Sequence, residues 1–193
     1  DSPFLEISGL AGYKSDYPVG GGAIAGIGVC CGVECIIFAN DPTVLAGAMH
    51  YYSVKKWMRS MAIARDCRIP FIQFVESAGG DLRPRGAMSA GAMGHFAESG
   101  RQFYEITELS KLNIPTVTVT FGTATAGGAY QPGMSDYNIF VKDQADVALA
   151  GPPLVQMATG EISSREEIGG AKMHAEKSGL AEYLADDDLD GIR

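Results

Sequence analysis

The chain has 193 residues, of which 46% are hydrophobic and 20% are charged, and its formal net charge at pH 7 is −8. This length and composition are typical of one globular domain that buries a core without disulfides or metal ions. The negative charge argues against nucleic-acid binding, because phosphate recognition needs a basic surface. It does not exclude a phosphorylated cofactor held by a few local arginines. No apolar run is long enough to predict a membrane span.

The apolar pattern predicts alternating strands and helices. In chain order we expect strands at 23–29 and 33–39, a helix over 53–67, a strand at 71–75, a helix over 95–109, strands at 116–120, 137–141 and 147–149, and a helix over 154–159. The first two strands are joined by a tight turn at Cys31-Gly32. The first helix carries one apolar stripe, formed by Val54, Trp57, Met58 and Met61.

Two patterns near the C-terminus indicate further helices. Ser163 and Glu166 have the spacing of a capping box, which predicts a helix start there. The acidic run Asp186–Asp188 is interpreted as a solvated stretch or a helix cap rather than a metal site. No internal linker interrupts the pattern, so we expect a single α/β domain over residues 1–193.

The start of the sequence and the cysteines bear on where in the cell the protein is located. Asp1–Tyr13 lacks the basic start and apolar stretch of a signal peptide, and the absence of an initial Met indicates a part of a longer protein. The cysteines lack zinc-site spacing, and most lie in apolar, strand-like sequence, so we expect buried, reduced thiols and no metal. Reduced thiols predict the cytoplasm, or the mitochondrial matrix if the protein is eukaryotic. These cysteines are Cys30, Cys31, Cys35 and Cys67.

One arrangement occurs twice: a helix, an Ile-Pro break, a β-branched strand and a run of very small residues. The small residues are Ser77-Ala78-Gly79-Gly80 the first time and Thr125-Ala126-Gly127-Gly128 the second. Such turns expose backbone N–H groups and let a ligand atom approach closely. Two of them facing each other would form an oxyanion hole for the charge that develops on a thioester oxygen. The alternative is that both are tight turns where helices pack closely on strands.

Other catalytic patterns are weak or missing. The histidines, His50, His95 and His174, are far apart in sequence and lack metal-ligand spacing. Ser77 follows a strand, but no histidine is placed by sequence to activate it, and there is no GxSxG elbow or GxxxxGK[ST] phosphate loop. Arg83 and Arg85 follow the first glycine pair and are candidates to pair with CoA phosphates, or are a solvated basic loop.

Several motifs together resemble the β subunits of biotin-dependent acyl-CoA carboxylases of the methylcrotonoyl-CoA, geranyl-CoA and long-chain types. Their order and spacing agree along nearly the whole chain. They are Gly-Ile-Gly at 26–28, Gly-Val-Glu-Cys at 32–35, Ala-Asn-Asp-Pro-Thr-Val at 39–44, Val-Lys-Lys at 54–56, Thr-Ala-Gly-Gly-Ala-Tyr at 125–130, Pro-Gly-Met-Ser-Asp at 132–136, Ala-Gly-Pro-Pro-Leu-Val at 150–155, Ala-Thr-Gly-Glu at 158–161 and Gly-Gly-Ala at 169–171.

The resemblance implies a crotonase-type (ClpP/crotonase-like) fold of stacked ββα units and a carboxyl-transfer reaction. Carboxybiotin on a partner carrier releases CO2, its freed ureido nitrogen takes the substrate proton, and the acyl-CoA enolate is carboxylated. The protein then contributes mainly positioning and oxyanion stabilisation, which agrees with the absence of an acid/base pair in the sequence. The resemblance predicts no metal in this part of the subunit.

Carried over by position, the resemblance assigns site residues. The family's Asp-Ser-Gly-Gly falls on Glu76-Ser77-Ala78-Gly79, and its second glycine pair falls on Gly127-Gly128. It implies backbone oxyanion stabilisation by Ala78, Gly79, Gly127 and Gly128. CoA binding by Gly80, Arg83 and Arg85 is predicted from their place at and after the first turn. Ala replaces a family Gly at position 78, where a positive φ would be strained.

The resemblance also implies partners. It predicts that the chain is the N-terminal, acyl-CoA-binding half of a longer subunit and lacks turnover alone. The C-terminal half, a biotin carboxylase with its biotin carrier, and further copies in a homo-oligomer would complete the enzyme. Two alternatives remain open: a crotonase-like hydratase, isomerase or acyl-CoA decarboxylase using Glu76 or Asp81, and a non-catalytic assembly subunit.

Overall fold

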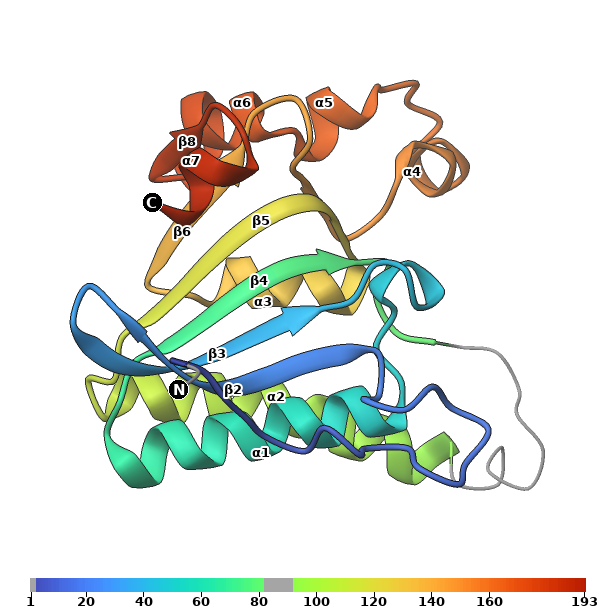
Figure 1. Cartoon of the computed structure of the whole chain (residues 1–193). Coiled ribbons are helices and arrows are strands. Elements are labelled where there is room, and N and C mark those ends of the chain that lie inside the picture. Colours follow the sequence, from blue (N-terminus) through green and yellow to red (C-terminus); the bar gives the residue numbers. More distant parts are fainter. Residues whose placement is uncertain (1–2, 82–91) are drawn as a thin grey trace.

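The computed structural model describes residues 3–81 and 92–193. Within these residues, an eight-stranded mixed sheet has the order β1-β2-β3-β4-β5-β6-β8, and β7 pairs with β5 (Figure 1). β1, β2 and β3 pair antiparallel, and the remaining pairs are parallel. The strands are β1 (Leu5–Glu6), β2 (Ala23–Cys30), β3 (Val33–Asn40), β4 (Phe71–Ser77), β5 (Thr116–Thr125), β6 (Tyr137–Val141), β7 (Asp146–Ala148) and β8 (Tyr183–Ala185).

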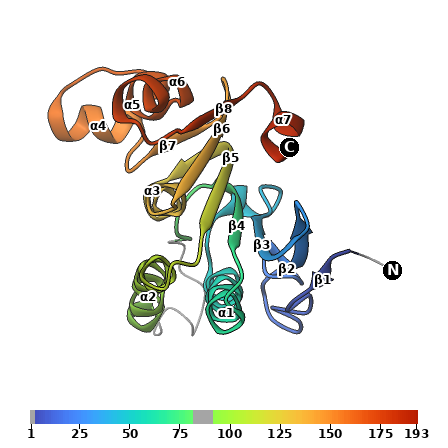
Figure 2. The same cartoon turned by 90° about the vertical axis from the view of Figure 1, so that its left-hand side faces the viewer.

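The helices are divided between the two faces of the sheet. Helices α1, α2 and α3 lie on one face, and α7 packs on the other against β5, β6 and β8 (Figure 2). No helix in the described ranges is long and apolar enough to cross a membrane. The helices are α1 (Tyr51–Cys67), α2 (Ala92–Lys111), α3 (Tyr130–Gly133), α4 (Pro152–Thr159), α5 (Arg165–Gly169), α6 (Ala171–Met173) and α7 (Asp188–Ile192), with the short turns η1 (Leu45–Gly47), η3 (Ala126–Ala129) and the π-helical η4 (His174–Ser178). The predicted α/β class is confirmed.

The β2–β3 hairpin follows the sequence prediction, but the cysteine prediction is largely wrong. Cys31 and Gly32 adopt φ values of 51° and 81°, as a two-residue turn with positive φ at both positions requires. Cys35 is buried, whereas Cys30, Cys31 and Cys67 are exposed free thiols. The reason is position: Cys30 and Cys31 form the tip of the hairpin, and Cys67 is the last residue of α1.

Helix α1 begins two residues before the predicted start, because its cap is unusual. His50 is the N-cap, its imidazole accepts from the Tyr52 N–H, and Ser53 Oγ accepts from the His50 N–H at 2.8 Å. Histidine is not among the usual N-cap residues, so the sequence does not reveal this start. Of the predicted apolar stripe, Val54, Trp57 and Met61 are buried, and Met58 is partly buried against the same core.

Three further differences have local causes. β5 continues to Thr125 rather than ending at residue 120, because β7 pairs with Thr123–Thr125. The capping box is formed by Ser164 and Glu167, one residue later than predicted. Asp187 caps α7, which confirms a helix cap in the acidic run.

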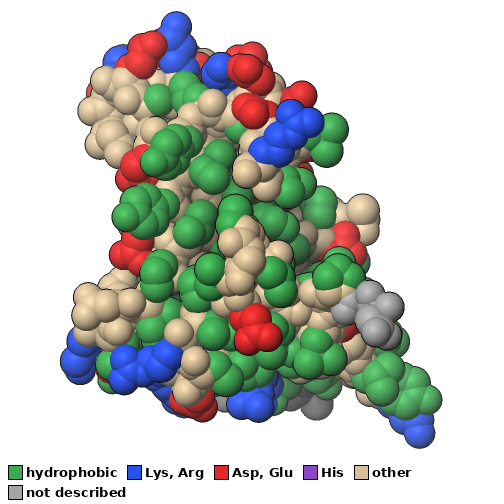
Figure 3. Space-filling model, turned by 60° about the vertical axis from the view of Figure 1, so that its left-hand side comes forward, with side chains coloured by type: hydrophobic (Ala, Val, Ile, Leu, Met, Phe, Trp, Pro, Cys, Tyr) green, Lys and Arg blue, Asp and Glu red, His purple; other side chains and the backbone are tan. Residues whose placement is uncertain are grey.

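The face of the sheet opposite α1 and α2 is only partly covered. Phe4 packs over Gly26 at one side, and Gly191 of α7 approaches Val119 at the other. Between them lies a strip of half-buried apolar side chains, Ile37, Ile72, Phe74, Val117 and Phe121. From this side, hydrophobic side chains spread over the middle of the molecule, Lys and Arg side chains gather at its two ends, and a few acidic side chains lie between (Figure 3). Parallel sheets usually have both faces covered, so this face is suited to further packing.

Lys56 is a buried cation that joins α1 to the N-terminal segment. It is 2% exposed, and its Nζ donates to the carbonyl oxygens of Ala23 at 2.7 Å and Gly20 at 3.2 Å. Burial lowers the pKa of Lys56, and the charge of Glu6 partly opposes that shift. Between the lowered folded pKa and the ordinary value, the unfolded chain therefore binds more protons than the folded chain.

This shift predicts a pH dependence of stability. As pH rises through that window, the unfolding free energy of the wild type is expected to increase relative to that of Lys56→Met, which cannot titrate there. Urea denaturation of both proteins between pH 7 and pH 10 measures the difference. Lys55→Met, on the same helix but exposed, controls for the loss of a positive charge. If the difference in unfolding free energy between the wild type and Lys56→Met stays flat or falls with pH, the lowered pKa of Lys56 is wrong.

Candidate functional site

The two predicted glycine turns lie side by side in the structure. They follow the neighbouring parallel strands β4 and β5, in which Ser77 pairs with Ala124. A Cβ atom placed on Gly128 would lie 3.0 Å from Cβ and Oγ of Ser77. A Cβ atom placed on Gly79 would lie 2.8 Å from the carbonyl oxygen of Thr125. Because larger residues do not fit at this contact, Gly79 and Gly128 allow the two turns to touch.

The backbone of the first turn shows that Ala78 does not carry the strain expected from a positive φ. Gly79 has a φ of +88°, and Ala78 is not among the residues with positive φ. A glycine is therefore required at position 79, where this chain has one, and alanine at position 78 causes no strain. In the second turn Ala126 has a φ of 53°, so a non-glycine residue adopts the left-handed conformation there.

A third segment, Leu45–Gly47, supports the first turn and was not predicted from the sequence. Leu45, Ala46 and Gly47 have consecutive positive φ values of 54°, 53° and 67°. This left-handed loop brings the carbonyl oxygen of Ala46 to the N–H of Ala78, which donates to it at 3.0 Å. Two non-glycine residues in this conformation cost about 1 to 2 kcal/mol each. The only signal in the sequence is Gly47 itself, in an otherwise ordinary apolar stretch.

Met49, two residues after this loop, extends the contact with the first turn. Its N–H donates to the carbonyl oxygen of Gly79 at 2.7 Å, and its own carbonyl oxygen accepts from Asp81 at 2.8 Å. Met49 thus forms a parallel bridge to Gly80. The loop from Leu45 to Met49 and the two turns make one assembly at the carboxyl ends of the parallel strands, where α/β folds commonly bind ligands.

The backbone donors in this assembly are not equally available. The N–H of Ala78 is bonded to Ala46, and the N–H of Gly79 donates to Ser77 Oγ at 3.2 Å. No acceptor for the Gly80 N–H occurs among the described residues, and Gly80 is exposed. Gly127 lies in the first turn of η3, where N–H groups lack a partner within the helix. Gly128 lies in the same turn but is buried against Ser77, so Gly80 and Gly127 are the donors best placed for a ligand.

The other sequence candidates have different surroundings. Glu76 packs over β5, since a Cβ placed on Gly122 would lie 2.7 Å from its Cδ. Strand alternation directs Glu76 to the opposite face of the sheet from Ser77, which contacts Gly128. His174 is held by Ser178 at 2.7 Å and by the carbonyl oxygen of Val147 at 2.8 Å, as expected of a structural histidine. Arg83 and Arg85 lie outside the described residues.

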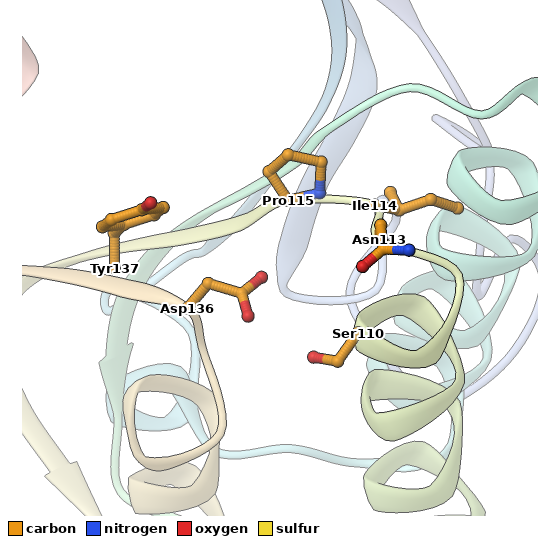
Figure 4. A pocket seen from close by; sticks show the side chains of 6 residues that line it. All are labelled: Ser110, Asn113, Ile114, Pro115, Asp136 and Tyr137. Atoms are coloured by element: carbon orange, nitrogen blue, oxygen red, sulfur yellow. The ribbon is translucent and has the colours of Figure 1, made fainter.

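A shallow pocket of about 400 Å³ lies at the other end of β5 (Figure 4). It is lined by Ser110, Asn113, Ile114, Pro115, Asp136 and Tyr137. Asp136 Oδ2 accepts from the N–H and Oγ1 of Thr116 at 2.8 and 2.9 Å, which fixes the start of β5. The pocket is at the amino ends of the strands and does not include the glycine turns. Among the described residues, no cluster of His, Cys, Asp and Glu has the arrangement of a metal site.

A family model described as the carboxyl transferase domain matches residues 1–193 of this chain. The chain belongs to this family. It is 50% identical to the probable biotin-dependent acyl-coenzyme A carboxylase beta2 subunit of Mycobacterium tuberculosis, over 100% of the chain and 35% of that protein. It is 45% identical to the probable mitochondrial methylcrotonoyl-CoA carboxylase beta chain of Drosophila melanogaster, over 97% of the chain and 32% of that protein.

Solved structures agree with this family assignment. The beta subunit of P. aeruginosa geranyl-CoA carboxylase superposes with a TM-score of 0.87 at 44% identity, over 99% of this chain and 34% of that one. A transcarboxylase 12S structure, at 23% identity and a TM-score of 0.84, supports the fold alone. The predicted crotonase-type fold and the resemblance to acyl-CoA carboxylase β subunits are thus confirmed. This carboxyl transferase domain spans about a third of the length of these relatives.

Proposed function

We propose that this carboxyl transferase domain binds an acyl-CoA and stabilises its enolate while carboxybiotin, carried by a partner, supplies CO2. The observation that supports it is the contact between the two glycine turns, Gly79 against Thr125 and Gly128 against Ser77. Each turn also carries a backbone N–H with no acceptor among the described residues, that of Gly80 in the first and that of Gly127 in the second. Two such donors stabilise negative charge on a thioester oxygen, and one donor is worth about 3 kcal/mol in comparable sites.

The role of each predicted residue is refined within this proposal. Gly80 and Gly127 donate to the thioester oxygen. Gly79 and Gly128 let the turns approach closely, and Ala78 anchors the first turn through its hydrogen bond to Ala46. Arg83 and Arg85 remain the predicted partners of the CoA phosphates, since a guanidinium group pairs well with phosphate oxygens.

The carboxyl-transfer proposal is favoured over a hydratase, isomerase or decarboxylase. Hydratases need a protein carboxylate at the site. Of the two candidates, Glu76 packs over Gly122 on the other face of the sheet, and Asp81 is the one that lies at the first turn. In carboxyl transfer the biotin ureido nitrogen takes the substrate proton, so the protein needs no such base. A non-catalytic role has less support, because alanine at position 78 leaves the turn unstrained.

The proposed partners follow from the names of the relatives and from the open sheet face. The relatives are named as biotin-dependent carboxylase subunits, so a biotin carboxylase and a biotin carrier are proposed for this chain. The transcarboxylase 12S protein forms a hexamer assembly. We extend the proposal to a homo-oligomer, because the apolar strip on the open face is suited to packing against another protein surface.

The remainder of a longer subunit is proposed to complete the catalytic site. A cytoplasmic or mitochondrial-matrix location is part of the same proposal.

Calorimetric titration with CoA and acyl-CoAs tests the proposal, using Gly80→Leu as the site variant. No described atom lies within 4 Å of a Cβ placed on Gly80, so the side chain fits the fold but crowds the N–H donor. We expect the wild type to bind acyl-CoA and Gly80→Leu to bind at least about tenfold more weakly, equivalent to about 1.4 kcal/mol.

The matched control is Gly100→Leu, which also enters open space but lies on α2. It is expected to bind acyl-CoA as the wild type does. Equal affinity in Gly80→Leu and Gly100→Leu would show that the ligand does not approach the first turn. Failure of the wild type to bind any acyl-CoA would argue against acyl-CoA binding by this domain.

A further inference from the structure

Met49 contacts both glycine turns. Its backbone is bonded to the first turn, through the carbonyl oxygen of Gly79 at 2.7 Å and the N–H of Asp81 at 2.8 Å. Its side chain reaches the second turn, because a Cβ placed on Gly127 would lie 3.3 Å from the terminal methyl carbon, Cε, of Met49. The backbone and the side chain therefore connect the two turns that form the candidate site.

The side chain of Met49 is held in a defined position. Met49 is 5% exposed, and Gln131 Nε2 donates to its Sδ at 3.6 Å. Gln131, at the start of α3, is itself fully buried. A methionine in a core is usually adaptable. Here the backbone bridge at one end and the Gln131 amide near the other fix where its methyl group lies.

We infer that Met49 is a specificity-determining residue, whose side chain limits the size of the acyl group accepted beside Gly127. The inference rests on the proposed function, in which the Gly127 N–H donates to the thioester oxygen. A substituent close to the thioester then lies next to that N–H. The Met49 methyl group occupies part of the space around the same glycine, so shortening the side chain enlarges the room for a branched or long acyl group.

The inference is tested by comparing affinities for CoA, acetyl-CoA, 3-methylcrotonoyl-CoA and a long-chain acyl-CoA in the wild type and Met49→Ala. One methylene in an apolar pocket changes discrimination by roughly 10- to 200-fold. We expect Met49→Ala to shift the affinity ratio of the bulkier acyl-CoAs to acetyl-CoA by about tenfold or more toward the bulkier ligands. The affinity for CoA itself is expected to stay unchanged, because CoA lacks an acyl group.

Two further variants separate specificity from stability. Met49→Leu keeps most of the side-chain volume, and its ratios are expected to stay close to those of the wild type. Met61→Ala truncates a fully buried methionine of α1 in the main core, so it is expected to lower stability without changing the ratios. If Met49→Ala does not fold by circular dichroism, Met49→Val, a smaller truncation, is measured in its place.

The outcomes distinguish this inference from the proposed function. If the wild type binds acyl-CoA and Gly80→Leu does not, but the Met49 truncation leaves every ratio unchanged, the role of Met49 in specificity is wrong and the site stands. A ratio shift of the same size in Met61→Ala would also overturn it, because the effect would then come from general loosening. If the wild type binds no acyl-CoA, the proposed function itself fails.

Discussion

Replacing Gly47 with alanine is expected to lower the unfolding free energy by more than about 3 kcal/mol. Gly47 has a φ of +67°, and an added Cβ would overlap the carbonyl oxygen of Glu76. The backbone fixes the position of the Cβ, and the oxygen is itself a backbone atom, so no side-chain rotation can relieve the overlap. The loop would have to move away from β4, which would break the hydrogen bond from the Ala78 N–H to Ala46. Urea denaturation followed by circular dichroism measures the loss.

This loss has two causes, the positive φ of Gly47 and the overlap of the added Cβ with the Glu76 carbonyl oxygen. The variant Gly160→Ala separates them. Gly160 has a φ of +78° at the end of α4, and a Cβ placed there meets no described atom within 4 Å. Its replacement carries the conformational cost alone, about 1 to 2 kcal/mol. If Gly47→Ala is no more destabilising than Gly160→Ala, the close contact between the left-handed loop and β4 is wrong. A folded Gly47→Ala protein is also expected to bind acyl-CoA more weakly than the wild type, because the first turn loses its support.

Replacing Trp57 with alanine is expected to cost about 3 to 5 kcal/mol of unfolding free energy. Trp57 is 1% exposed and is among the largest fully buried side chains of the described residues. It packs against Phe38 of β3, with ring centroids 6.1 Å apart, and so joins α1 to the sheet. Because Trp57 is the only tryptophan of the chain, unfolding of the variant is followed by circular dichroism rather than by fluorescence.

Trp57→Phe is the informative comparison. The indole Nε1–H is buried, and no described residue accepts its hydrogen bond, so phenylalanine removes a donor without breaking a bond. Its cost then comes from the smaller ring alone and is expected to be about 1 to 2 kcal/mol. A Trp57→Phe protein as unstable as Trp57→Ala would contradict this picture and show that the indole N–H has an acceptor.

Local sequence patterns predicted the regular elements well. The strand at Tyr137–Val141 has the predicted bounds, and the hairpin turn follows from Gly32 and the apolar runs beside it. Errors occur where distant residues decide an element's end. β5 extends to Thr125 because β7, more than twenty residues later, pairs with it. The two-residue strand β1 exists only because it pairs with β2, and its sequence has no periodicity of its own.

The sequence by itself determined the family, the α/β class and the two glycine turns, because these depend on residue type and spacing along the chain. Only the tertiary structure showed which glycines serve packing and which leave a donor available. The hydrogen bond that occupies the Ala78 N–H comes from Ala46, and the side chain that covers Gly127 comes from Met49. These contacts join residues that are far apart in sequence, and the left-handed loop that makes them follows no periodic pattern.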